Sequence, residues 1–307
     1  MQTILSDLFR TIEADLGAHA FCMLTLDALK SALSQYRIEN RKEFIDQLMK
    51  VFELVQHTKP RYAILNDSFF QIIERVESTK DDEDIKSLLD EIERIKIGYD
   101  LELKSLIQVG SDIDVEGKTV LIYDHSHTVH NVLKAMHTAG KEFSVLVAEQ
   151  EIEKTADSIA FLHANQIPFK VVPSYMLSHV DHTVDMIFLG AVTLQENYHF
   201  VMDPGTKSIV SHFHLEGKPI YLFLSSSKFS LWKLEKPAQE VYAKAHLKTH
   251  HRMTEIEFEQ LKFSHDRVSL ELLSYVVTSE GILEPKELKV LFDKKYKKRQ
   301  AIKKKYF

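Results

Sequence analysis

The sequence predicts an α/β protein in which a helical N-terminal domain precedes a Rossmann-like domain with a parallel sheet. Four short apolar runs, rich in β-branched and aromatic residues, lie at 119–123, 143–148, 184–190 and 219–224. They do not alternate between apolar and polar residues, which is typical of strands covered on both faces. Helical patterns at 127–139, 155–165 and 205–215 separate the runs. This alternation of strand and helix favours a parallel sheet with crossover helices.

Residues 1–105 instead show apolar residues at helical spacing. The expected helices cover 1–16, 25–36, 41–56, 62–76 and 85–107. The first of them has an apolar face formed by Ile4, Leu5, Leu8, Ile12 and Leu16. The acidic run 81–84 is expected to be the solvated start of the fifth helix rather than a cation site.

Glycines at both ends of the segment 110–117 mark a domain boundary, because glycine and small polar residues end a helix directly before the first strand. We therefore expect a helical domain at 1–110, a Rossmann-like domain at 117–293 and a basic tail at 294–307. Within the second domain, a short helix is expected at 241–250. The last helix is expected at 286–298, running into the tail.

The composition suits a packed globular protein, since 44% of the 307 residues are hydrophobic and 27% are charged. Cys22 is the single cysteine, so one chain can form neither an internal disulfide nor a cysteine-based zinc site. The N-terminus lacks the features of a signal peptide, and no apolar run is long enough to span a membrane. These observations predict a soluble cytoplasmic protein.

The charge of the chain is unevenly distributed. The formal net charge is −6, but residues 294–307 contain eight lysines and arginines and no acid, which leaves −14 on the rest of the chain. A body that binds nucleic acid over its general surface is therefore disfavoured. The basic tail is a candidate contact for RNA or the ribosome, or alternatively a solubilising extension.

In a parallel sheet, ligands bind beyond the carboxyl ends of the strands. The segments expected to carry function are therefore 123–128, 149–152, 190–193 and 225–228. The first contains several histidines, and His127 and His130 are three residues apart, so they could share a helix face as metal ligands. Imidazoles also line polar loops without a metal, and pairs arise by chance among 16 histidines. We expect no metal site and no cofactor.

The order of these elements resembles the initiation-factor-2B-like family. The residues that carry the resemblance are 120–133, 140–149, 184–191, Gly205-Thr206, Ser227-Lys228-Phe229 and Thr278-Ser279-Glu280-Gly281, all within about residues 60–290. The family includes the α, β and δ subunits of eukaryotic initiation factor 2B. It also includes methylthioribose-1-phosphate isomerase and archaeal ribose-1,5-bisphosphate isomerase. The resemblance implies a helical domain followed by a Rossmann-like domain, and a homodimer or larger assembly that pairs through the C-terminal domain.

The catalytic residues that the resemblance implies are absent from this sequence. Asp124 occupies the position of the isomerases' catalytic cysteine, and Val192 that of their catalytic aspartate. A valine side chain cannot transfer protons. Glu151 and Asp203 stand where the enzymes carry cations, and an acid there repels a phosphate. The N-terminal Arg-Gly-Ala of the enzymes corresponds to Leu16-Gly17-Ala18, without the arginine.

Polar residues of the family's ligand site nevertheless remain. The candidate ligand-binding residues are Ser126, His127, Thr128, Gly190, Gly205, Thr206 and Lys228. Ser126 could instead cap a helix, the two glycines could form turns, and Lys228 could extend into solvent. Lys207 is a possible substitute for the lost lysine, and Asp124 a possible new base.

Two functions therefore follow from the resemblance. The first is a non-catalytic binding or regulatory protein, a pseudoenzyme that senses a phosphorylated ligand or contacts a translation factor. The alternative is an aldose–ketose isomerase of a ribose-phosphate type with rearranged catalytic groups.

Overall fold

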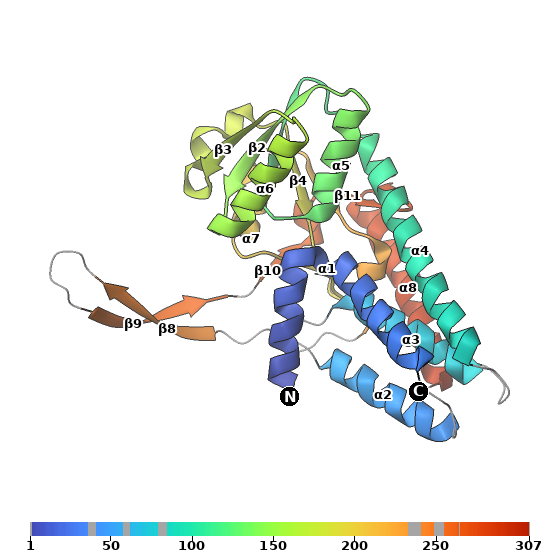
Figure 1. The fold of residues 1–307 in the computed structure, drawn as a ribbon. Coiled ribbons are helices and arrows are strands. Elements are labelled where there is room, and N and C mark those ends of the chain that lie inside the picture. The colour runs from blue at the N-terminus through green and yellow to red at the C-terminus, as the bar shows by residue number, and fades with distance from the viewer. Residues whose placement is uncertain are drawn as a thin grey trace.

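The computed structural model describes residues 2–35, 41–57, 62–78, 85–232, 241–248, 255–263 and 265–306. The acidic run 81–84 lies outside the described residues. Helices α1 to α4 form the first part of the chain, and a seven-stranded sheet flanked by helices forms the second (Figure 1). Within the described residues, no helix is long and apolar enough to cross a membrane.

The helical part consists of α1 (Gln2–Ser34), α2 (Arg41–Gln56), α3 (Ala63–Ser78) and α4 (Ile85–Ser111). Their buried faces share one core, which includes Phe21, Leu48, Phe69 and Ile92. The two helices expected at 1–16 and 25–36 are one span, bent at Gly17, whose φ of 76° is open to glycine but unfavourable for other residues.

The apolar face predicted for the first helix is wrong in part. Leu8 and Leu16 are 52% and 42% exposed, whereas Phe9 and Ile12 pack on the helical core. Ile12 belongs to the predicted face and Phe9 does not, so the buried face of this segment is offset from the predicted one. Phe9 instead meets Phe21 edge to face, with 4.8 Å between the ring centroids.

The sheet has the strand order β12-β11-β7-β4-β1-β2-β3. Its strands are β1 (Lys118–Ile122), β2 (Phe143–Glu149), β3 (Phe169–Pro173), β4 (Met186–Gly190), β7 (Ile220–Phe223), β11 (Tyr275–Thr278) and β12 (Gly281–Leu283). All neighbours pair in parallel except β12, which is antiparallel to β11. The six parallel strands thus have the order of a doubly wound Rossmann sheet, and the order reverses between β1 and β4.

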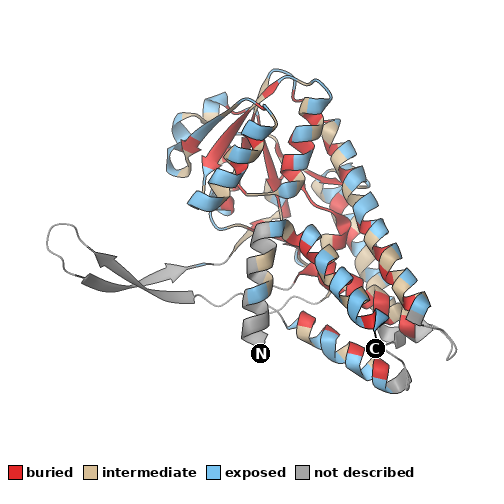
Figure 2. Ribbon diagram, viewed as in Figure 1, coloured by how far each residue is buried: buried red, intermediate tan, exposed pale blue. Residues whose placement is uncertain are grey.

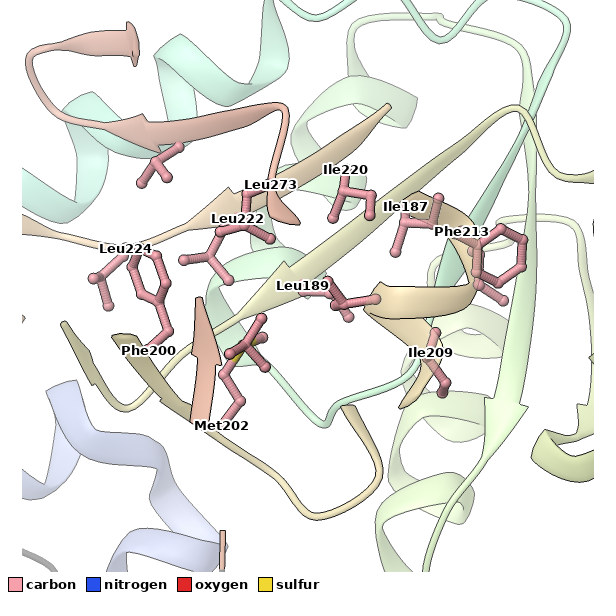
Figure 3. Packing of buried hydrophobic residues seen from close by; sticks show 14 of the residues in the cluster. Ile187, Leu189, Phe200, Met202, Ile209, Phe213, Ile220, Leu222, Leu224 and Leu273 are labelled. Atoms are coloured by element: carbon pink, nitrogen blue, oxygen red, sulfur yellow. The ribbon is translucent and has the colours of Figure 1, made fainter. Parts of the chain in front are cut away.

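Both faces of the sheet are covered, as the unbroken apolar runs predict (Figure 2). Helices α4, α5 (His127–Thr138) and α6 (Ile152–Ala164) contribute to the core on one face. Helices α7 (Thr206–Leu215) and α8 (Pro285–Tyr306) contribute to the core on the other. In that second core, Figure 3 shows Ile187 of β4 next to Phe213 of α7, and Leu189 of β4 on the side of Ile209.

The smaller elements complete the fold. A three-stranded antiparallel sheet joins β5 (Thr193–Leu194), β6 (His199–Met202) and β10 (Asp266–Ser269). Short 3-10 turns are η1 (Ser174–His179), η2 (Asp181–Thr183), η3 (Ser226–Lys228) and η4 (Leu270–Leu272). Strands β8 (Val241–Lys248) and β9 (Glu255–Lys262) form a hairpin that extends away from the body in Figure 1.

Three sequence predictions need correction here. Residues 241–248 form strand β8, not a helix, because they pair along their whole length with β9. Gly110 lies inside α4 and is buried, so the helix ends at Ser111 and not before the glycine. A side chain at Gly110 would lie 2.9 Å from Phe223 and 3.0 Å from Val132, which explains the glycine by close packing. The predicted tail is part of α8, which continues to Tyr306.

Candidate functional site

The four loops predicted to carry function lie together at one edge of the sheet. They follow the carboxyl ends of β1, β2, β4 and β7, which are neighbours in the sheet. The loops after β1 and β4 flank the point where the strand order reverses. In doubly wound folds this point is where ligands bind. The candidate site is therefore built around the residues that follow β1 and β4.

Asp124 is the buried centre of this site. It is 7% exposed, and its Oδ2 accepts a 2.7 Å hydrogen bond from the backbone N–H of Gly190. Oδ1 is buried and has no hydrogen-bond partner among the described residues. Burial, followed by the negative charge of Asp203, raises the pKa of Asp124 to about 8. At neutral pH this side chain is therefore mainly a neutral carboxylic acid.

Ser126 and Gly190 fit closely against each other. Ser126 is the N-cap of α5, and its Oγ accepts a 3.3 Å hydrogen bond from the N–H of Val129. A Cβ on Gly190 would lie 2.2 Å from that Oγ, so only glycine allows this approach. The alternative suggested for Ser126, a helix cap, thus has structural support, whereas Gly190 is explained by close packing and not by the suggested turn.

His127 is the first residue of α5, where it faces the bend in α1. A Cβ on Gly17 would lie 2.9 Å from its Nδ1. Burial, and after it the positive charge of Lys228, lowers the pKa of His127. Thr128 follows at the same helix end and is half-buried. The structure thus brings Ser126, His127, Thr128 and Lys228 to the N-terminal end of α5, beside Gly190.

The loop after β7 is filled by a carboxylate from α4. Oε1 of Glu102 accepts hydrogen bonds from the Ser226 hydroxyl at 2.5 Å and from the Ser227 N–H at 3.2 Å. Lys295 of α8 donates to the same Ser226 hydroxyl at 2.9 Å and lies 3.1 Å from Glu280. The Ser226 hydroxyl and the Ser227 N–H are therefore satisfied within the chain.

The N-terminus of α7 is filled in the same way. Oδ2 of Asp266 accepts hydrogen bonds from the N–H groups of Gly205 at 3.0 Å and Lys207 at 2.9 Å. Such amides at a helix N-terminus are an anion site, and here the anion is a side chain of β10. The adjacent Thr206 is fully buried, and its hydroxyl has no partner among the described residues. Tyr123 joins this region to the first loop through a 2.8 Å hydrogen bond to the carbonyl of Pro204.

One cation of the region, Lys154, is also paired with an acid. Lys154 of α6 lies 2.6 Å from Oδ2 of Asp203. Val192 has a packing role, because its side chain lies against the core of the helical part. Glu151 precedes α6 and makes no capping hydrogen bond. The acidic residues that stand in place of cations thus neutralise a lysine or remain exposed.

The histidines after β1 form an aromatic cluster. His130 is 3% exposed and stacks on Phe161, with 4.4 Å between ring centroids. His125 meets His130 and His127 edge to face, at 5.1 and 4.8 Å. Burial lowers the pKa of His130 to about 3, so its ring is neutral. Among the described residues, no group of three or more histidines, cysteines and acids is placed to hold a metal ion.

With this geometry in view, comparison with known proteins identifies the family. A profile of the Initiation factor 2 subunit family matches residues 15–285. The chain belongs to this family. It is 23% identical over 211 residues to translation initiation factor eIF2B subunit alpha of Dictyostelium discoideum, covering 67% of this chain and 66% of that one. It is 22% identical over 289 residues to methylthioribose-1-phosphate isomerase of Acetivibrio thermocellus, covering 88% and 84%.

Solved structures of the Initiation factor 2 subunit family share the fold. A translation initiation factor eIF-2B from Pyrococcus horikoshii OT3 superposes with a TM-score of 0.69 at 15% identity, covering 87% of this chain and 90% of that chain. The tetrameric eIF2B-β2-δ2 complex from Chaetomium thermophilum gives a TM-score of 0.71 at 14% identity, covering 95% and 93%. The predicted helical N-terminal part followed by a mostly parallel sheet is confirmed.

Sequence reasoning missed several residues that shape the site of this family member. Glu102, Asp266, Lys154 and Lys295 hold the loops, and only Lys154 stands next to a predicted functional loop in the sequence. Glu102 and Ser226 are separated by 124 positions, and Asp266 and Gly205 by 61. The sequence offered one signal, the exchange of cations for acids at Glu151 and Asp203.

Proposed function

We propose that this protein is a non-catalytic member of its family, with a binding or regulatory role in translation. One observation carries the proposal. Three of the groups at the site that could hold a phosphate are bound to carboxylates of the same chain. Asp266 accepts hydrogen bonds at the N-terminus of α7, and Glu102 accepts them in the loop after β7. Asp203 forms an ion pair with the ammonium group of Lys154.

A phosphate that binds to these groups would have to displace the carboxylates from them. It would also be repelled by the negative charge of the displaced carboxylates. Each displacement breaks one or two charge-assisted hydrogen bonds, which are stronger than neutral ones. The proton-transfer chemistry of an isomerase also needs an acid and a base within reach of adjacent carbons. Val192 supplies neither, and its side chain packs into the helical core. These features support a scaffold that has kept its fold and lost its reaction.

A turnover assay tests this proposal directly. Full-length protein is incubated with methylthioribose-1-phosphate or ribose-1,5-bisphosphate, and the ketose product is measured. We expect no turnover above the uncatalysed reaction, and less than about 1 °C of thermal stabilisation by either compound or by AMP at concentrations near a millimolar. Turnover at an ordinary enzymatic rate of about 1 s⁻¹ or more would overturn the proposal.

An isomerase with rearranged groups remains a second candidate because of Asp124. A buried carboxyl with a pKa of about 8 and an unbonded Oδ1 has the properties of a general acid or base. The decisive variant is Asp124→Asn, which keeps the acceptor for Gly190 but cannot exchange a proton. Turnover that is present in the wild type and absent in this variant would establish Asp124 as the catalytic group.

We also propose that the protein works in the cytoplasm as a homo-oligomer that pairs through its C-terminal domain. The β2-δ2 tetramer with which it shares its fold supports an assembly of several chains. Any small phosphorylated regulator would bind where Ser126, His127, Thr128 and Lys228 meet. Light scattering of the purified chain measures the assembly, and a monomer at cellular concentration would contradict this part of the proposal.

A further inference from the structure

The C-terminal half of α8 carries a row of lysines whose orientation is fixed by the residues on its other side. Lys294, Lys297 and Lys298 are exposed, and they have no ion-pair or hydrogen-bond partner among the residues the structure describes. Helical spacing of three and four residues places Lys294 beside both of the others. The sequence adds Lys303, Lys304 and Lys305 in the last turns of the same helix.

Other polar residues of this helix are engaged with the body. Arg299 pairs with Asp67, and its guanidinium lies 3.9 Å from the centre of the Phe70 ring. Lys295 pairs with Glu280, and Gln300 donates to the carbonyl of Leu231 at 3.1 Å. The helix is therefore anchored along one side. The exposed lysines are presented by a fixed helix and not by a free tail.

The acids of the helix do not neutralise the row by direct pairing. The carboxylate of Asp293 accepts a 2.6 Å hydrogen bond from the Tyr198 hydroxyl. That of Glu287 accepts a 2.8 Å hydrogen bond from the backbone of Glu284. Because the rest of the chain carries −14, this concentration of cations contrasts with its surroundings.

From this arrangement we infer that the exposed lysine row of α8 binds the phosphate backbone of a nucleic acid, most directly RNA. The described exposed positions from 293 to 301 include no aromatic or large apolar residue. Protein interfaces are depleted in lysine and depend on aromatic and arginine anchors, so this surface suits a polyanion better than a protein. Without groups that read base edges, the contact is independent of sequence.

The acidic remainder of the surface determines how such a complex forms. It repels phosphate over a Debye length of about 10 Å at ordinary ionic strength, so approach of RNA at α8 is favoured over approach at the acidic surface. Each lysine that neutralises a phosphate releases a counterion and adds about 0.7 to 0.9 to the slope of log affinity against log salt. Three lysines therefore account for a slope of about 2 to 3.

A salt titration with matched variants tests the inference. Binding of the full-length protein to a labelled RNA duplex, an RNA single strand and a DNA duplex is followed by fluorescence anisotropy as KCl is raised. The triple variant Lys294→Gln, Lys297→Gln and Lys298→Gln is compared with the wild type. A control removes three exposed lysines elsewhere, through Lys104→Gln, Lys134→Gln and Lys170→Gln.

Both triple variants lose three positive charges, so net charge alone cannot separate them. We expect the α8 variant to lose about 2 to 3 from the salt slope, while the control keeps the wild-type slope. Between about 50 and 200 mM salt, this slope corresponds to about 20- to 40-fold in affinity. Because Lys295 and Arg299 are retained, helical content and melting temperature should match the wild type.

Several results would overturn the inference. Equal slopes for the two triple variants would show that position on α8 is irrelevant. If the wild-type protein bound no nucleic acid at low salt, the lysine row would be only a solvated surface. Tighter binding of polyglutamate than of RNA would make an acidic protein the partner. The RNA and DNA arms identify the type of nucleic acid, and none of these outcomes depends on whether the protein isomerises a sugar phosphate.

Discussion

Replacing Arg299 by methionine is expected to destabilise the protein strongly through the attachment of α8. The guanidinium and the carboxylate of Asp67 form an ion pair in which the two side chains are 15% and 16% exposed. Burial lowers the pKa of Arg299 to about 10, so the group is still charged at pH 7. Asp67 also accepts hydrogen bonds from the Tyr99 hydroxyl at 2.7 Å and from Gln71 at 2.8 Å.

The expected magnitude follows from removing one partner of this pair. A buried charge left without its partner costs about 3 to 5 kcal/mol. Asp67 keeps two neutral donors, which places the expected loss near the lower end, about 3 kcal/mol. For a chain of this size, each kcal/mol shifts the melting temperature by about 2 °C, so we expect a decrease of about 6 °C.

Thermal and urea unfolding followed by circular dichroism measure this change. The matched control is Lys298→Met, which makes the same kind of charge loss at the neighbouring exposed position and should stay within about 0.5 kcal/mol of the wild type. The double variant Asp67→Asn with Arg299→Met should lose less than the sum of the two single changes, since each removes the same interaction. Equal melting temperatures for Arg299→Met and Lys298→Met would show that the ion pair does not hold α8. Full additivity of the stability losses of Asp67→Asn and Arg299→Met would show the same.

Three further predictions concern the candidate site. Gly190→Ala should destabilise the fold, because its Cβ would lie 2.2 Å from Oγ of Ser126, and Ser126→Gly in the same chain should restore part of the loss in a thermal melt. Asp266→Ala should cost about 1 to 2 kcal/mol as a lost helix cap and should introduce measurable sulfate binding by calorimetry, whereas Asp266→Asn should lose less stability. For Asp124 the folded-state pKa of about 8 exceeds the ordinary value of 3.8, so the folded state binds more protons and stability falls as pH rises between these values. The fall approaches about 1.4 kcal/mol per pH unit, and Asp124→Asn should flatten it; an unchanged pH profile in that variant would show that another group is responsible.

The sequence predicts best those elements that have a strong local signal. Strands β1, β2, β4 and β7 are buried on both faces, so each appears as an unbroken apolar run. Strand β3 was missed because it lies at the edge of the sheet, where Lys170 and Val171 are exposed and only Val172 is buried. The short strands β5, β6 and β10 form through pairing between distant segments, which no local pattern reveals.

The position of the candidate site could be predicted from the sequence, but not the carboxylates that occupy its hydrogen-bond donors. The rule that ligands bind beyond the carboxyl ends of parallel strands placed Asp124, Ser126, Gly190 and Lys228 in one region, and the strand order of the structure agrees with it. The carboxylates that fill this region come from α4 and β10, and their partners are far along the chain. A spacing of 61 or 124 residues contains no periodic signal, so only the folded structure shows that Asp266 and Glu102 occupy the donors.

The filled donors also bear on the stability of the unliganded protein. Backbone donors kept vacant for a phosphate would carry a cost in the unliganded protein, because buried unpaired polar groups are destabilising. Here Asp266 and Glu102 satisfy them within the chain. An intramolecular carboxylate competes at a high effective concentration, so a free phosphate must bind tightly merely to displace it. The same residues that stabilise the fold therefore oppose phosphate binding, which predicts that variants gaining phosphate affinity at Asp266 or Glu102 will be less stable than the wild type.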